Sequence, residues 1–174
     1  MRRFLFLISV SFILSFQSWA QEEHYATWNK NYPKQDVTKV LTAEQEYANK
    51  VDSGKVKKGS PSYSRMDKMR FKAVFTGETR PMQEKARETM KFVFGFFGQK
   101  KFLYVFDEIK KEYEFKVGGQ KLWLSIQNRI DPYFVKEVKK NEEVLLYCLF
   151  FNAHPQKNDL RNYFLISEFR AKGY

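Results

Sequence analysis

The sequence predicts an α+β fold: a small antiparallel β-sheet, or an OB-like or SH3-like barrel, in the order strand-strand-helix-strand-strand after one or two helices. Three observations predict it. Residues 144–151 are a run of eight uncharged, mostly large residues. Gly118-Gly119 separates two segments of alternating apolar residues, which is typical of a hairpin turn. A short helical pattern begins near Pro132. An open sheet and a closed barrel both fit this order.

The run at residues 144–151 is the predicted centre of the fold. Alternate side chains of a strand point to opposite faces, and both sets are apolar here. The pattern therefore predicts a strand buried on both faces. Cys148 lies inside the run, which favours a buried and unreactive thiol. Because it is the single cysteine, no disulfide within the chain is expected.

Residues 1–20 are predicted to be a secretory signal peptide. Two arginines precede an uncharged stretch, residues 4–16, and small residues Ser18 and Ala20 follow it. That stretch would span about 20 Å as a helix, less than the roughly 30 Å core of a bilayer. We therefore expect cleavage after Ala20 and an exported protein, periplasmic or secreted, with no transmembrane segment left.

Residues 21–65 are predicted to form a mobile arm, a short helix and a basic linker. Residues 21–40 are polar and without periodicity. Thr42 and Gln45 resemble a capping box, which predicts a helix from Ala43 to about Asp52. Residues 53–65 have the Gly, Ser, Pro and Lys composition of a linker. A single globular domain is predicted over residues 66–174.

The first half of that domain allows two interpretations. Residues 66–75 suggest a short strand that ends at Thr76-Gly77. Thr79 and Pro81 favour a helix start, with one apolar face formed by Met82, Ala86, Met90, Val93 and Phe97. Residues 92–106 also alternate in a way that fits a hairpin, so both interpretations stay open and the helix is favoured.

The second half is clearer. Strands are predicted at residues 112–117 and 121–127 around the Gly-Gly turn, and at residues 162–169. Asp131 and Pro132 favour the start of a helix that ends at Asn141, with Phe134, Val135 and Val138 on its inner side. A loop is expected from His154.

The segment Gly118-Gly-Gln-Lys-Leu-Trp-Leu-Ser-Ile-Gln127 and the final Glu168-Phe169 resemble features of exported bacterial proteins of unassigned activity. In those proteins a Gly-Gly turn precedes Trp-Leu-Pro-Val-Gln. Ser125 stands where that pattern has proline. The resemblance covers about residues 108–170 and implies no activity.

Positive charge is concentrated in the middle of the chain. The formal net charge is +11, and residues 50–101 hold 14 Lys and Arg against five Asp and Glu. Basic side chains interleaved with aromatic ones are typical of polyanion binding, and an exported protein would meet anionic lipid or polysaccharide rather than nucleic acid. The residues predicted for such a site are Lys55, Lys57, Lys58, Arg65, Lys68, Arg70 and Lys72. A simple solubilising role explains the same lysines.

Aromatic residues are concentrated between positions 92 and 106. Most are expected in the core, but a domain of this size cannot easily bury them all. The predicted partner-binding residues are Phe92, Phe96, Phe102 and Tyr104.

Residue patterns for catalysis are weak. No metal site and no cofactor are predicted, since His24, Cys148 and His154 lack metal-ligand spacing. Cys148 and His154 would lie about 20 Å apart along a strand, too far for a catalytic pair. Glu112 and Glu114 would share one strand face about 7 Å apart, which suits paired acids but is more typical of a solvated face.

We therefore expect a non-enzymatic, exported domain that binds an unknown protein or anionic envelope ligand. The polyanion-binding module of residues 50–72 is the first alternative, and a carboxylate-dependent hydrolase is the second.

Overall fold

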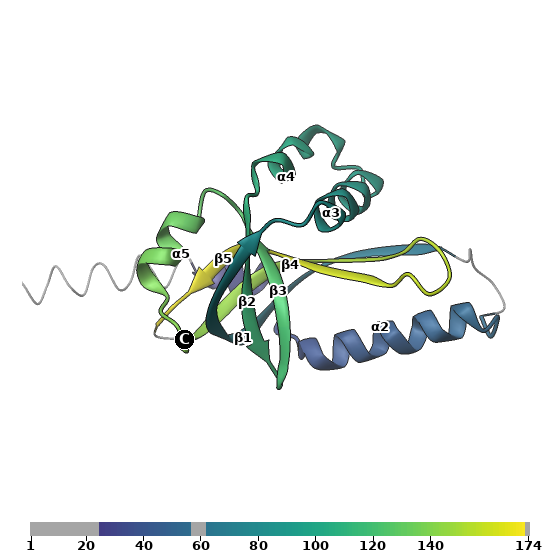
Figure 1. Ribbon diagram of the computed structural model, residues 1–174, viewed down its shortest axis with the longest axis horizontal. Coiled ribbons are helices and arrows are strands. Elements are labelled where there is room, and N and C mark those ends of the chain that lie inside the picture. The colour runs from purple at the N-terminus through teal and green to yellow at the C-terminus, as the bar shows by residue number, and fades with distance from the viewer. Residues whose placement is uncertain (1–24, 57–61, 173–174) are drawn as a thin grey trace, which may run out of the picture.

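The computed structural model describes residues 25–56 and 62–172. In this part of the chain five strands form a closed barrel in the order β1-β2-β3-β5-β4, with β4 returning to β1 (Figure 1). The strands are β1 Tyr63–Pro81, β2 Lys111–Val117, β3 Gln120–Ile126, β4 Glu143–His154 and β5 Arg161–Arg170. The helices are α2 Val37–Asp52, α3 Glu84–Phe96, α4 Tyr104–Glu108 and α5 Asp131–Glu137, with a short 3₁₀ turn, η1 Lys100–Phe102.

The topology confirms the predicted α+β fold and selects its closed form. Every neighbouring pair of strands is antiparallel except β3 and β5, which are parallel. Helix α5 lies between β3 and β4 and covers one end of the barrel, where the Phe134 ring packs against Phe75, Tyr113 and Phe169 (Figure 1). A five-stranded barrel of this kind, with one helix before its fourth strand, is OB-like.

Strand β4 is buried on both faces, as predicted. Leu146, Cys148 and Phe150 point into the barrel core, whereas Tyr147 and Phe151 lie on its outer face and are equally inaccessible. Burial raises the pKa of the Cys148 thiol, which keeps it protonated and unreactive. Two different segments cover the outer face.

The first covering segment is the N-terminal one, which was predicted to be a mobile arm. Residues 25–31 are helical instead, and Trp28 and Tyr32 pack on Tyr147 with ring centroids 5.7 and 5.9 Å away. The Arg70 guanidinium donates to the carbonyl oxygens of Asn29 and Tyr32, both at 2.5 Å. Residues 21–40 show no apolar periodicity, because this segment is anchored by only a few aromatic side chains.

The second covering layer is α3 with η1 and α4. Met90 and Val93 of α3 are buried beside Phe106 and Phe151, as the apolar helical face predicted. Residues 92–106 therefore form helices joined by a turn, with no strand, and the hairpin alternative is wrong. Phe97 was expected on the buried face but is largely exposed, because α3 ends at Phe96 and the chain turns away.

Helix α2 begins six residues earlier than predicted. Asp36, not Thr42, caps it, with its side chain accepting from the backbone N–H groups of Thr38 and Lys39. Val37 is buried in the barrel core, and the buried Glu44 forms an ion pair with Arg65 of β1. Helix α2 is therefore longer than its weakly apolar sequence predicts, because contacts with the barrel stabilise its first turns.

Strand β1 is longer than predicted at both ends. It begins at Tyr63 inside the predicted linker, and the domain boundary at residue 66 stays a prediction. The predicted stop at Thr76-Gly77 is a register shift between Phe75 and Thr79, with Gly77 at φ +87°. A bulge bends a strand without ending it. Thr79 and Pro81 then pair with β2, so the predicted helix start there is wrong; α3 begins at Glu84.

Three further expectations in the second half are wrong. Val135 of α5 is exposed, because Phe134 and Val138, four residues apart, already form the inward face of this short helix. The helix ends at Glu137 rather than at Asn141. His154 is the last residue of β4, not a loop residue, and it is fully buried against the ring of Tyr63.

We predict that Tyr147→Ala lowers the free energy of unfolding by about 3–4 kcal/mol, because it removes a buried ring that anchors the N-terminal segment. The Tyr147 hydroxyl also donates to the Asn29 side chain at 3.0 Å. Tyr133→Ala, at an exposed position of α5, is the matched control and should stay within about 0.5 kcal/mol of the wild type. Urea unfolding measures both. Equal losses in the two variants would contradict the anchoring role.

Candidate functional site

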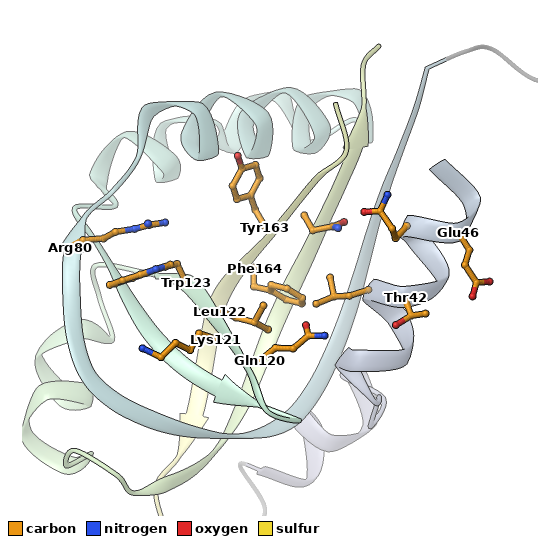
Figure 2. A pocket seen from close by; sticks show the side chains of 12 residues that line it. Thr42, Glu46, Arg80, Gln120, Lys121, Leu122, Trp123, Tyr163 and Phe164 are labelled. Atoms are coloured by element: carbon orange, nitrogen blue, oxygen red, sulfur yellow. The ribbon is translucent and has the colours of Figure 1, made fainter. Parts of the chain in front are cut away.

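The barrel wall has a slot between β3 and β5. The ladder that joins these strands has two residue pairs among the described residues, Ser125 with Leu165 and Ile126 with Ile166. Toward the start of both strands a pocket of about 550 Å³ separates them, bordered by α2 (Figure 2). We call this pocket the slot. It is lined by Leu41, Thr42, Gln45, Glu46, Arg80, Gln120, Lys121, Leu122, Trp123, Asn162, Tyr163 and Phe164.

The Gly118-Gly119 turn fixes one border of the slot. Both glycines have positive φ, as a tight hairpin between β2 and β3 requires. A Cβ atom on Gly118 would lie 2.4 Å from the Thr38 hydroxyl oxygen, so the turn lies directly against α2. Strand β5 meanwhile follows β4 almost to the far end of that strand, up to the pair of Ala153 with Arg161. The two strands are held by different partners, and the slot lies between them.

Arg80 and Trp123 form a rigid platform at one end of the slot (Figure 2). The Arg80 guanidinium carbon lies 4.2 Å from the centroid of the Trp123 ring, a cation–π contact. Its Nε donates to Glu112 Oε2 at 2.7 Å, and this carboxylate is 1% exposed. The ion pair holds the guanidinium plane, which in turn supports one face of the indole.

The second cation of the slot is also paired. Lys121 Nζ lies 3.0 Å from Glu114 Oε1, and this hydrogen bond lowers the pKa of the Glu114 carboxyl. With Glu46 as a further lining residue, the carboxylates in and beneath the slot balance its cations. The slot is therefore not a cationic surface.

Apolar and amide side chains share the remainder of the slot. Leu122 and Phe164 come from the core-facing sides of β3 and β5, and Leu41 adds an apolar contact from α2. Gln45, Gln120 and Asn162 supply amide groups that both donate and accept hydrogen bonds. This mixture of an apolar floor and polar rims is typical of binding sites for small molecules and for short chains.

The residues considered for catalysis do not form a catalytic arrangement. Glu112 and Glu114 lie on one strand face, as predicted, but both are buried and ion-paired rather than solvated. A general acid needs a raised pKa, and that of Glu114 is lowered. Cys148 and His154 lie six residues apart in one continuous strand, and His154 Nε2 lies 3.1 Å from Asp52 instead.

Three of the predicted polyanion-binding residues already have partners within the protein. Arg65 pairs with Glu44 and Asp67, and Arg70 donates to backbone carbonyls. Lys72 pairs with Glu143. Lys55 and Lys68 are exposed, and Lys57 and Lys58 lie outside the described residues, as does the predicted signal peptide. The polyanion site stays a prediction.

The predicted partner-binding aromatic residues are exposed on consecutive helical elements. Phe92, Phe96, Phe102 and Tyr104 are exposed on α3, η1 and α4, and Phe97 joins them. Their role in binding stays a prediction. The slot, by contrast, was missed. The sequence feature that could have indicated the slot is Trp123, the one aromatic residue on the otherwise polar face of its strand.

No protein-family model, curated protein or solved structure matches this chain. Within the described residues no helix is long and apolar enough to cross a membrane. The same residues contain no group of three or more His, Cys, Asp or Glu side chains able to hold a metal ion.

We predict that the Glu114 carboxyl titrates below the ordinary glutamate pKa of about 4.3. Its contribution to stability is then complete above the unfolded-state pKa and is lost as the pH falls through the folded-state pKa. Carbon-detected NMR titration measures this directly. Lys121→Met is the matched variant and should return the Glu114 pKa toward its ordinary value. A pKa above the ordinary value would instead support the hydrolase alternative.

Proposed function

We propose that this protein is an exported, non-catalytic binding domain that holds an extended polypeptide segment in the slot between β3 and β5. The observation that carries the proposal is the short ladder between these strands, with two residue pairs among the described residues. The remaining lengths of both strands face each other across the pocket.

Strand edges that face a pocket are suited to binding by β-augmentation. In that mode, main-chain hydrogen bonds to a strand edge supply affinity, and alternate side chains of the ligand enter pockets. Residues 120–123 of β3 and 162–164 of β5 line the slot, and each segment is paired on its other side with β2 or β4. A third extended chain between them would continue the sheet.

The charge of the slot favours a ligand segment without many charges. Arg80 and Lys121 already have carboxylate partners, so a polyphosphate or another polyanion would have to compete with them. The apolar side chains Leu122 and Phe164 favour an aliphatic or aromatic ligand residue at the centre. The indole of Trp123 offers a stacking surface at the end of the slot.

A peptide-selection experiment tests the proposal. Random linear peptides displayed on phage would be selected on the immobilised protein, and hydrogen exchange would be followed with the selected peptides. We expect amide protection at residues 120–123 and 161–164. N-methylation of a peptide bond that pairs with a strand edge should weaken binding at least about tenfold, since each such bond loses its donor.

Paired variants locate the binding. Trp123→Ala should weaken the selected peptides about tenfold or more, whereas Tyr133→Ala on α5 should not change their affinity. Protection that falls on α3 and α4 instead would overturn the slot as the site. Binding of neutral oligosaccharides in the slot, with no peptide selected, would overturn the ligand class.

Export is part of the proposal and rests on residues 1–20. A basic start, a short apolar stretch and small residues at Ser18 and Ala20 support it. When the full gene is expressed in a Gram-negative host, we expect the protein in the periplasmic fraction with Gln21 as its first residue. Intact-mass and N-terminal analysis measure this. A cytoplasmic protein that retains Met1 would contradict it, whereas Ala20→Phe should impair cleavage.

A further inference from the structure

Five aromatic side chains of the helical layer formed by α3, η1 and α4 are exposed. Figure 1 shows α3 and α4 of this layer. We call these five side chains the aromatic tip: Phe92, Phe96, Phe97, Phe102 and Tyr104. Phe96 is the most exposed, at 70% of its surface. They come from the end of α3, from η1 and from the start of α4, with Gly98 making the reversal between the helices at φ +83°.

The aromatic tip is not needed to cover the barrel. Met90, Val93 and Phe106 perform that role on the inner side of the same helices, where they pack with Phe151 of β4. Three of the outward rings contact one another: the ring centroids of Phe92 and Phe96 lie 6.4 Å apart, and those of Phe96 and Phe97 lie 5.5 Å apart. A contiguous exposed aromatic cluster of this kind marks an interaction surface.

The charge around the aromatic tip indicates what it binds. Residues 91–108 contain three lysines, Asp107 and Glu108, and Glu108 lines a pocket together with Phe102 and Tyr104. Lys91 is neutralised by Asp107, with 2.8 Å between Nζ and Oδ1. Lys100 and Lys101 remain exposed beside the rings, and Lys101 Nζ lies 4.8 Å above the ring of Phe102. Exposed rings and unshared positive charge thus occupy one projecting edge.

We propose that the aromatic tip binds the surface of an anionic phospholipid bilayer. Aromatic side chains prefer the interface between head groups and acyl chains, and nearby lysines are attracted to anionic head groups. The slot is bordered by α2, and its lining residues do not include any of the aromatic tip. The inference does not depend on the proposed function.

Vesicle sedimentation tests this inference with the full chain. Vesicles of phosphatidylcholine mixed with phosphatidylglycerol would be compared with vesicles of phosphatidylcholine alone. We expect the protein to sediment with the anionic vesicles, and added salt should weaken this binding. The double variant Phe92→Ser with Phe96→Ser should bind at least about tenfold more weakly, because it loses the inserted rings.

Two further variants separate the contributions. Lys100→Glu with Lys101→Glu should remove the preference for anionic vesicles, whereas Tyr133→Ser, an equally exposed aromatic position on α5, should leave binding unchanged. All chains share residues 1–20, so any membrane affinity of that segment cancels in the comparison. Circular dichroism checks that each variant is folded.

Three results would overturn the inference. The first is equal binding of the wild type and the Phe92/Phe96 double variant to anionic vesicles. The second is an equal loss of binding in Tyr133→Ser. The third is a wild-type dimer that the double variant converts to a monomer, together with no vesicle binding, since the aromatic tip would then be a contact between copies of this chain.

Discussion

Strand β4 pairs with β1 along one edge and with β5 along the other, and both of its faces are packed. A strand with no polar face must be covered twice, and this requirement explains most of the architecture. The barrel interior covers Leu146 and Phe150. The N-terminal segment covers Tyr147, and the layer of α3 and α4 covers Phe151. Helices that would be marginal alone are thereby stabilised by tertiary contact.

The same pairing creates the slot. Because β5 runs beside β4 almost throughout, and β3 is held by the hairpin to β2, the two strands meet in a short parallel ladder. The ion pair of Arg80 with the buried Glu112 carboxylate then orders the Trp123 ring at the slot's end. Pairing arginine with a buried carboxylate offsets the cost of desolvating both groups and leaves a fixed surface for a ligand.

The slot and the aromatic tip are both bordered by helices that pack on the barrel. The helices that cover Phe151 have an inner face committed to the barrel and an outer face that retains the exposed rings. Helix α2 packs on the barrel through Val37 and borders the slot through Leu41 and Gln45. Helix α2 and the layer of α3 and α4 thus each pack on the barrel with one side and border a surface proposed for binding with another.

The sequence by itself determined the doubly buried strand, the Gly-Gly hairpin, the helix near Pro132 and the exposed aromatic residues, because each has a local pattern of spacing or composition. Tertiary structure alone decided the start of α2, the continuation of β1 past Gly77 and the docking of residues 25–32. In each of these, a few long-range contacts outweigh weak local preferences. The slot belongs to the second group, since it depends on where two strands that are distant in sequence stop pairing, which no local pattern records.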